Sequence, residues 1–282
     1  IEVVKKELEF LDRDHINLYI GIPFCPTKCK YCSFASYEIN GGVGRYYNDF
    51  VKTLLEEIKL AGKFLKKEEL KISSIYIGGG TPSTLTENDL EKVLQAIDKY
   101  IDKKDIKEFT FEAGREDSLS IEKLEIAKKY GVDRISLNPQ TFKISTLEKV
   151  NRKFNRESFD RYFDVAKELG FIINMDFIIG LPGETTEDIL NTLKEIEKFD
   201  VDNLTIHTLA FKRASNLFKE SQDRVELDGK KINLAISTLT KSKKLFPYYM
   251  YRQKNIMEWG ENIGFAKKGT ESIFNIEMIE EN

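Results

Sequence analysis

Short apolar runs alternate with longer amphipathic stretches along most of the chain. The apolar runs are rich in Ile, Val, Phe and Tyr, and their length and composition are typical of β-strands. They occupy residues 17–22, 72–77, 108–112, 134–137, 171–179 and 203–208. The stretches between them are rich in Lys and Glu at the spacing of an amphipathic helix. They lie near residues 45–64, 87–100, 121–130, 157–169 and 186–199. This alternation predicts a parallel sheet with helices on its outer face.

The number of strand–helix units suggests the type of sheet. Six units are visible, and eight would make a complete TIM-type barrel. The chain therefore predicts an α/β fold, a partial and open (β/α) barrel of about six units. Thr86, Ser120 and Thr185 each stand just before acidic residues, which predicts that three helices begin there. Gly131 and Gly170 follow helices where a C-terminal glycine is expected.

The pattern changes after residue 202. A helix is predicted over 230–245 and an aromatic strand or turn over 247–252, whereas 260–282 contains short apolar runs without a clear period. We therefore divide the chain into a barrel core, residues 1–215, and a C-terminal α+β extension, residues 216–282. Because the chain begins with Ile1 and not Met, we expect it to be a piece of a longer protein with a truncated extension.

Charged residues are nearly balanced over the chain. Lys and Arg number 44 and Asp and Glu number 47, a net charge of −3, which argues against a nucleic-acid partner because such proteins carry a basic excess. No run approaches 18 apolar residues, so no membrane span is predicted, and the first 14 residues are too charged for a signal peptide. Three cysteines exclude an even disulfide framework, and a cytoplasmic location is the expectation.

The candidate chemistry centres on three cysteines that follow the first predicted strand. Cys25, Cys29 and Cys32 have the spacing C-x3-C-x2-C. Thiolates are the ligands of iron–sulfur clusters, and three on one loop can hold three corners of a [4Fe–4S] cube. The fourth iron then stays open to a small molecule. Two alternatives remain: small buried hydrophobic side chains, or a structural zinc site, for which a fourth ligand is lacking.

Further candidate residues fall at the ends of the later predicted strands. In a (β/α) barrel the carboxyl ends of the strands meet at one face, where the chemistry collects. Besides Cys25, the positions there are residues 78–81, Glu112, Gln140, Asp176 and His207. Residues 78–82 read Gly-Gly-Gly-Thr-Pro, and glycines let the backbone approach a ligand closely. A tight structural turn is the alternative for this glycine-rich segment.

The cysteine spacing after a strand, with the glycine-rich segment beside it, resembles the radical S-adenosylmethionine (SAM) superfamily over nearly the whole chain. The resemblance implies a [4Fe–4S] cluster and SAM as cofactors. In that superfamily the amine and carboxylate of SAM chelate the open iron. One electron from the cluster then releases a 5′-deoxyadenosyl radical, which abstracts a hydrogen atom from the substrate.

A more specific resemblance is to the oxygen-independent coproporphyrinogen III dehydrogenase (HemN/HemW-like) family. The residues that match that family's SAM site are Tyr19, Tyr31, Gly79, Gly80, Thr81, Glu112, Gln140, Arg152, Asp176 and Ala210. The chemistry agrees, because the carboxylates can accept from hydroxyls or an ammonium, and Arg152 can pair with a carboxylate. For each charged residue taken alone, an ordinary solvated or salt-bridged side chain is the alternative.

The closest match within that family is its HemZ-like branch, on segments 33–36, 112–115, 211–215 and 248–255. Phe34 stands where the best-studied branch has a fourth Cys, and Gly21 where it has His. The family's heme-chaperone branch also lacks that Cys. The resemblance therefore implies a radical SAM oxidoreductase that decarboxylates coproporphyrinogen III, or else a heme-transfer protein or an anaerobic heme-degrading methyltransferase. It also implies a tetrapyrrole partner and a flavodoxin or ferredoxin as electron donor.

Several later residues carry hypotheses about the substrate. His207 can act in proton transfer or substrate binding, with a structural histidine as the alternative. Lys212 and Arg213 suit a substrate with several carboxylates, with a solvated loop as the alternative. Residues 248–255 combine aromatic rings with two cations. They can cover a tetrapyrrole face, or form an edge strand that packs on the barrel. No catalytic residue is assigned from the sequence.

Overall fold

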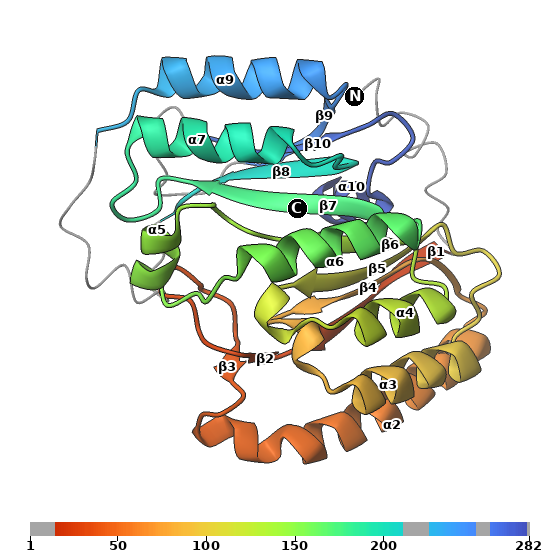
Figure 1. The fold of residues 1–282 in the computed structure, drawn as a ribbon. Coiled ribbons are helices and arrows are strands. Elements are labelled where there is room, and N and C mark those ends of the chain that lie inside the picture. The colour runs from red at the N-terminus through yellow and green to blue at the C-terminus, as the bar shows by residue number, and fades with distance from the viewer. Residues whose placement is uncertain (1–14, 211–225, 252–259, 281–282) are drawn as a thin grey trace.

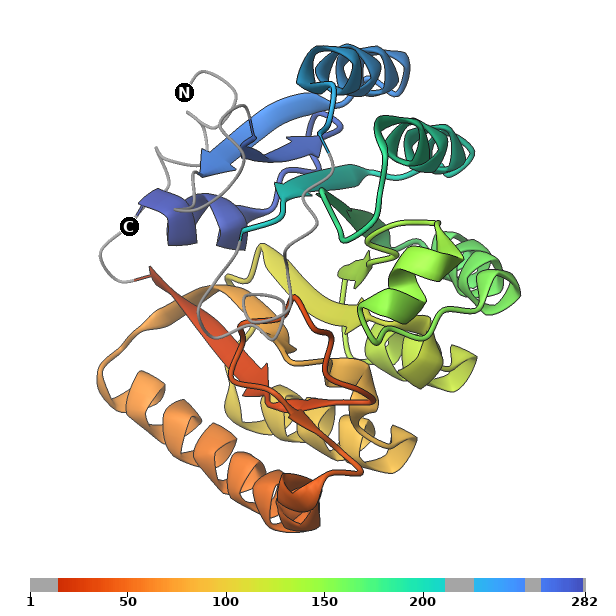
Figure 2. The same ribbon diagram turned by 90° about the vertical axis from the view of Figure 1, so that its left-hand side faces the viewer.

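Six parallel strands follow the six predicted apolar runs. The structure, a computed structural model, describes residues 15–210, 226–251 and 260–280. The strands are β1 (His15–Ile22), β4 (Lys71–Gly79), β5 (Glu108–Gly114), β6 (Arg134–Leu137), β7 (Ile172–Ile179) and β8 (Asn203–Thr208). They lie side by side in chain order, each parallel to the next. The partial (β/α) barrel predicted from the sequence is therefore confirmed (Figures 1 and 2).

Amphipathic helices cover the outer face of this curved sheet (Figure 2). They are α2 (Tyr47–Lys67), α3 (Glu87–Tyr100), α4 (Ile121–Lys129), α6 (Arg156–Glu168) and α7 (Thr186–Glu197), together with the short α5 (Ile144–Lys149), which was not predicted. Thr86, Ser120 and Thr185 cap their helices as predicted, since each side chain accepts a backbone N–H three residues later. Phe109 and Phe177 are among the fully buried core side chains, each of which contributes about 2 kcal/mol by burial.

The C-terminal part extends the same sheet. It consists of α9 (Gly229–Ser242), β9 (Phe246–Tyr251), β10 (Asn262–Ala266) and α10 (Ile273–Glu280). Strand β10 pairs antiparallel with β8, and β9 pairs antiparallel with β10 and forms the sheet edge. The predicted helix and aromatic strand are confirmed, whereas β10 and α10 were not predicted. The division of the chain at residue 215 stays a prediction.

Helix α10 lies across the opening between the two sheet edges, β1 and β9 (Figure 2). The buried Glu108 carboxylate accepts hydrogen bonds from Ser272 Oγ (2.9 Å) and from the Ile273 backbone N–H (2.7 Å) at the helix N-terminus. On the other side of the helix start, Arg134 donates to the Thr270 carbonyl (2.8 Å). The Phe274 ring stacks on Tyr76, with centroids 4.5 Å apart. These contacts fix α10 inside the open side of the barrel.

Shorter elements lie in the loops that follow the strands. Strands β2 (Phe24–Cys25) and β3 (Tyr37–Glu38) pair with each other, and 3₁₀ turns occur at Gly42–Tyr46, Pro82–Thr84 and Glu116–Ser118. Among the described helices, none combines the length and apolar character needed to cross a membrane.

Candidate functional site

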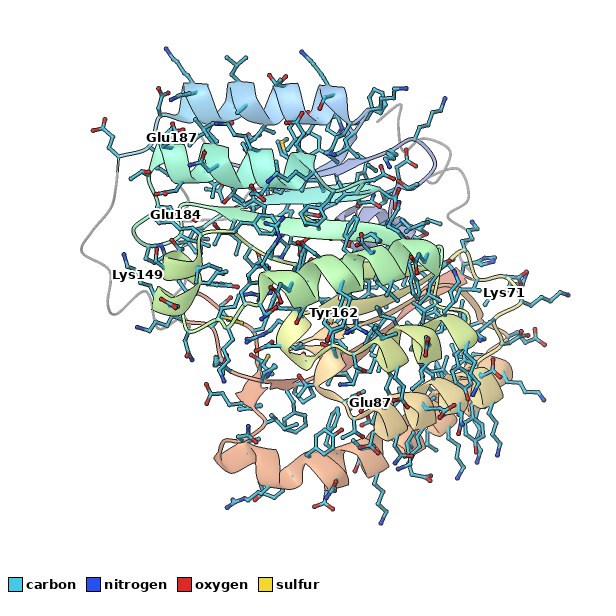
Figure 3. All side chains as sticks on the ribbon, viewed as in Figure 1. Lys71, Glu87, Lys149, Tyr162, Glu184 and Glu187 are labelled. Carbon is cyan, nitrogen blue, oxygen red and sulfur yellow. The ribbon has the colours of Figure 1, made fainter. Side chains whose placement is uncertain are left out.

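The two ends of the barrel differ in chemistry. Lys71 begins β4 at one end, whereas Lys149 and Glu184 lie in the segments after β6 and β7 at the other (Figure 3). The latter is the carboxyl end of the strands, where (β/α) barrels carry their active sites. The cysteines also follow the carboxyl end of β1. Most of the residues predicted for the site meet here.

Three cysteines line a small cavity of about 90 Å³, here called the cysteine pocket. Cys25 and Cys29 are buried, Cys32 is half-buried, and all three are free thiols. Within the described part of the chain, no three His, Cys, Asp or Glu side chains converge as ligands of a single ion. The donor chemistry, three thiols on one loop, fits a cluster.

The glycine-rich segment is fastened directly to the cysteine loop. The Gly80 N–H donates to the Ile22 carbonyl and the Thr81 N–H to the Phe24 carbonyl, both at 2.8 Å. The Thr81 hydroxyl donates to Cys25 Sγ at 3.3 Å. A Cβ on Gly80 would lie 2.8 Å from the Phe24 carbonyl oxygen and 3.0 Å from Cys25 Sγ. Glycine is needed here because the two loops touch, which gives the motif a role beyond a tight turn.

Arg115 is a component of this pocket that the sequence did not reveal. Its side chain is 3% exposed and forms a two-point ion pair with Asp117, with Nε–Oδ1 at 2.8 Å and Nη2–Oδ2 at 2.6 Å. It also donates to the Thr27 carbonyl (2.9 Å) and lies 3.6 Å from Cys29 Sγ. Arg115 thus holds the cysteine loop against the end of β5. The available signal was a charged residue directly after a predicted strand.

Gln140 and Arg152 line the cysteine pocket as predicted and carry unpaired atoms. Both are buried, and within the described residues Gln140 Oε1 and Arg152 Nε have no hydrogen-bond partner. Arg152 Nη2 donates to the carbonyls of Gly114 and Asn138. Gln140 has φ 66°, an uncommon value for a residue with a side chain. Buried orphan atoms of this kind indicate a polar ligand, so the lining of the pocket suits the charged end of SAM beside the cluster.

Glu112 lies between the cysteine pocket and the interior of the barrel. Burial and then the nearby charge of Asp176 raise the pKa of the Glu112 carboxyl from 4.5 to about 8. The Gly79 N–H and Arg152 oppose this shift only partly. A carboxyl in this state gains stability as an anion when a cation arrives beside it. The position therefore suits an ammonium group.

Asp176 points away from the cysteines, into a second cavity of about 250 Å³ here called the interior cavity. Its Oδ1 accepts from Asn174 Nδ2 at 2.7 Å, and its Oδ2 lies 3.9 Å from His207 Nε2. His207 Nδ1 lies 3.2 Å from the Tyr251 hydroxyl. The structure therefore brings His207 into contact with a predicted SAM residue, which the sequence left open.

Of the three remaining predicted SAM residues, Tyr31 lines the cysteine pocket. Tyr19 is half-exposed and stacks on Tyr76 at 5.9 Å, and partial burial together with Glu112 raises the pKa of Tyr19 to about 12. Ala210 is buried just after β8. Tyr19 and Ala210 line neither cavity, so the structure does not bring these two predicted residues into the pockets.

The aromatic segment proposed to cover a substrate is only partly described. Tyr248, Tyr249 and Tyr251 all line the interior cavity, and Tyr248 also packs with Ala266 and Ile276. The segment belongs to β9, so the edge-strand alternative is confirmed. Residues 252–255, and the cations at 212 and 213, lie outside the described residues.

Comparisons with known proteins assign the family. The chain matches the model of the Radical SAM superfamily over residues 19–196. It is 40% identical over 274 residues to the oxygen-independent coproporphyrinogen-III oxidase-like protein HemZ of Bacillus subtilis, covering 95% of this chain and 54% of the relative. It is 32% identical over 265 residues to the heme chaperone HemW of the same organism, covering 92% of this chain and 66% of the relative.

A solved structure agrees on the fold. Coproporphyrinogen III oxidase (HemN) from Escherichia coli superposes with a TM-score of 0.74 at 20% identity, over 94% of this chain and 58% of that one. The chain thus spans between about half and two thirds of the length of these relatives. Members of the superfamily use a [4Fe–4S] cluster and SAM. Because the family match covers more than half of its length, the chain belongs to the radical SAM superfamily, and these are its cofactors.

Proposed function

We propose that this protein is a radical SAM enzyme that acts on a tetrapyrrole, and that it decarboxylates coproporphyrinogen III oxidatively without oxygen. One observation carries the SAM part of the proposal. The three cysteines, the glycine-rich segment and the polar residues with orphan atoms share one pocket at the carboxyl ends of the strands. The tetrapyrrole part is supported by the names of the HemZ, HemW and HemN relatives.

In this proposal each residue of the cysteine pocket has a role. Cys25, Cys29 and Cys32 hold the cluster, which when bound supplies the electron that cleaves SAM to a hydrogen-abstracting 5′-deoxyadenosyl radical. Glu112 receives the SAM ammonium, because its carboxyl is a weak acid until a cation arrives. Arg152 offers its free Nε to the carboxylate.

The backbone around the pocket positions the ligand and excludes water. Gly79, Gly80 and Thr81 bring the chain close to the cysteines, and Gln140 presents its free carbonyl oxygen. Tyr31 lines the pocket from the cysteine loop, and Asp176 lines the neighbouring interior cavity. A radical needs such enclosure, since exposure permits side reactions. For Tyr19 and Ala210 the role in binding SAM rests on the resemblance to the family.

The proposal includes an external electron donor, and a groove beside the cysteine loop is its proposed docking surface. The groove, of about 670 Å³, is lined by Lys28, Lys30 and Lys149, with Glu38 and Glu148 among the other residues. Cations exceed anions there, although the whole chain is slightly acidic. An acidic electron-transfer protein such as a flavodoxin or ferredoxin would complement this surface.

The test uses the full-length protein, reconstituted anaerobically with iron and sulfide. Incubation with SAM, a reductant and coproporphyrinogen III is expected to yield protoporphyrinogen and 5′-deoxyadenosine. Methionine formation without any decarboxylation would reject the assignment of substrate. A Cys29→Ser variant, which lacks one thiolate, should produce neither compound.

Heme transfer is a second candidate, favoured by Phe34. This side chain lines the cysteine pocket and is 66% exposed, and it stands where the decarboxylating branch has a fourth cysteine. An exposed aromatic ring suits stacking on a flat macrocycle. Stoichiometric heme binding followed by transfer to an apo-acceptor would support this candidate, and failure to bind heme would remove it. Loss of heme absorbance with methyl transfer from SAM would instead indicate heme degradation.

A further inference from the structure

The interior cavity is lined mostly by neutral polar groups that bond to one another. Tyr249 Oη donates to Thr205 Oγ1 at 3.3 Å, and Thr205 Oγ1 donates to Asn174 Oδ1 at 3.1 Å. The amide of Asn174 then donates to Asp176 Oδ1 at 2.7 Å. This chain of bonds runs from β9 to β7 and fixes the orientation of the Asp176 carboxylate.

Two atoms at the cavity wall face each other without a bond. Asp176 Oδ2 and His207 Nε2 are 3.9 Å apart, with side chains only 18% and 27% exposed. That separation is too long for a hydrogen bond. Among the described residues, neither atom has a hydrogen-bond partner in any other side chain or backbone group. Each side chain is fixed through its other polar atom: Asp176 Oδ1 bonds to Asn174, and His207 Nδ1 bonds to Tyr251.

Tyr251 bonds to the Nδ1 nitrogen of His207, and the direction of this bond depends on the tautomer of the imidazole. Its hydroxyl lies 3.2 Å from His207 Nδ1, and the two rings meet edge to face. A phenol that donates to Nδ1 leaves the proton of a neutral imidazole on Nε2. The pair then presents one donor, Nε2–H, and one acceptor, the carboxylate Oδ2.

Only a group that both donates and accepts through a single atom can bridge this pair. An ammonium cannot accept from Nε2–H, and a carboxylate cannot donate to Oδ2, whereas a hydroxyl does both. SAM carries hydroxyls on its ribose alone. The interior cavity, about 250 Å³, has room for a sugar but is smaller than the usual pocket for a drug-sized ligand.

We infer that His207, oriented by Tyr251, binds a ribose hydroxyl of SAM jointly with Asp176. The inference rests on the proposed function for the placement of SAM, and it adds a residue to the SAM site. The methionyl end of SAM then lies in the cysteine pocket and the sugar at the mouth of the interior cavity. His207 is thereby a binding residue with a defined tautomer, which goes beyond a structural histidine.

The experiment compares adenosine with 2′-deoxyadenosine and 3′-deoxyadenosine, titrated calorimetrically into the purified full chain. The wild type is expected to bind adenosine about tenfold more tightly than at least one deoxy form, because that form leaves Nε2 and Oδ2 unbridged. In His207→Phe this preference should disappear, so that all three nucleosides bind with similar affinity. A preference retained by His207→Phe, or no preference in the wild type, would overturn the inference.

Two further variants separate binding from folding. Tyr251→Phe should reduce the preference about threefold by releasing the imidazole, and His207→Gln should retain part of it through its amide N–H. Tyr248→Phe is the matched control, because its hydroxyl bonds to Asn275 on α10, and it should keep the full preference. If His207→Phe does not fold, Tyr251→Phe against Tyr248→Phe decides the matter. An unchanged preference in Tyr251→Phe would then contradict the inference.

The nucleoside titration is independent of the reaction. A wild type that prefers adenosine but forms no porphyrin product would reject the proposed substrate and leave His207 as a ribose ligand. A wild type that decarboxylates coproporphyrinogen but binds the three nucleosides equally would support the proposed substrate and reject His207 as a ribose ligand.

Discussion

The cysteine pocket and the interior cavity are neighbours built on opposite principles. The cysteine pocket contains buried charges, Arg115 and Arg152, which are held by backbone carbonyls and by Asp117. The interior cavity contains mostly hydroxyls and amides that bond to one another, and its lining also includes the buried Arg134 and the partly buried Asp176. The first is therefore arranged around charged groups held in fixed places, and the second is formed mostly by neutral polar groups.

The two regions also differ in where their walls come from. The cysteine pocket is made by the segments at and after the carboxyl ends of β1, β4, β5 and β6. The interior cavity needs β9 and α10 as well as the barrel strands. The walls of the cysteine pocket therefore come mainly from the ends of the barrel strands and the loops after them, whereas the interior cavity is closed by the C-terminal elements. Variants that act on one region and spare the other test this division.

The largest effect is expected from Arg115→Met in the cysteine pocket. The change leaves Asp117 without its partner and removes both bonds to Thr27. Breaking a buried ion pair on one side typically costs several kcal/mol, so the free energy of unfolding should fall by about 3 kcal/mol. Urea denaturation of the purified chain measures this fall.

A matched surface substitution completes that test. Lys129 pairs with Glu91 at 2.7 Å, but its side chain is 62% exposed. Lys129→Met should leave the free energy of unfolding nearly unchanged, since exposed pairs contribute little. Equal losses for the two variants would show that Arg115 has no special role in the pocket.

A smaller loss is expected from Gly80→Ala, at the contact between the two loops. The new Cβ would press on the Phe24 carbonyl and on Cys25 Sγ, and neither can move without shifting the backbone. Overpacking of this kind costs about 2 kcal/mol, and the iron content after reconstitution should fall with it. Gly42→Ala is the control, because nothing lies within 4 Å of its Cβ position. Urea denaturation and iron analysis measure both effects. Equal stability and iron content in Gly80→Ala and Gly42→Ala would show that the contact at Gly80 is not needed.

The interior cavity has its own test in Gly264→Ala on β10. A Cβ there would lie 1.9 Å from Cε1 of Tyr249, so the ring must leave its place and give up its bond to Thr205. We expect a loss of about 1 kcal/mol with normal iron content, since the cysteine pocket is untouched. Reduced iron content in this variant would show that the two regions are not separable.

The sequence predicted the regions to different extents. Local patterns located the six strands, most helices and the cysteine loop, because periodicity and capping depend on neighbours in the chain. Helix α10 and strand β10 were missed. Helix α10 has only eight residues and its polar residues do not gather on one face, and β10 has only five residues.

Long-range partners explain the other gaps at the site. Arg115 looks like a solvated charge until Thr27, 88 residues away, is placed beside it. His207 stayed ambiguous for the same reason, since its partner Tyr251 lies 44 residues later, on a strand that does not pair directly with β8. The resemblance to the family identified candidate SAM residues, but the sequence did not indicate which of them line the cysteine pocket and which line the interior cavity.

A dependence of stability on pH is expected where the two regions meet, at Glu112. Because its pKa of about 8 in the fold exceeds the ordinary 4.5, the folded chain binds more protons than the unfolded chain between these values. Stability must therefore fall as the pH rises through this range. Glu112→Gln cannot titrate, so in the absence of cofactors its stability should gain on the wild type by about 3 kcal/mol from pH 5 to pH 8.

Asp176→Asn tests how strongly the charge of Asp176, in the interior cavity, affects the pKa of Glu112, in the cysteine pocket. Burial is the larger cause of the raised pKa of Glu112 and the charge of Asp176 the second, so in an Asp176→Asn background the gain from Glu112→Gln should shrink but persist. Urea denaturation at pH 5, 6.5 and 8 measures stability against pH for the wild type, Glu112→Gln, Asp176→Asn and the double variant. Glu91→Gln is the control: hydrogen bonds from Lys129 and Tyr130 lower the pKa of Glu91, so its difference from the wild type should stay constant over this range. A gain from Glu112→Gln of the same size in both backgrounds would mean that the carboxyl responds to burial alone, and that the cysteine pocket and the interior cavity are electrostatically independent.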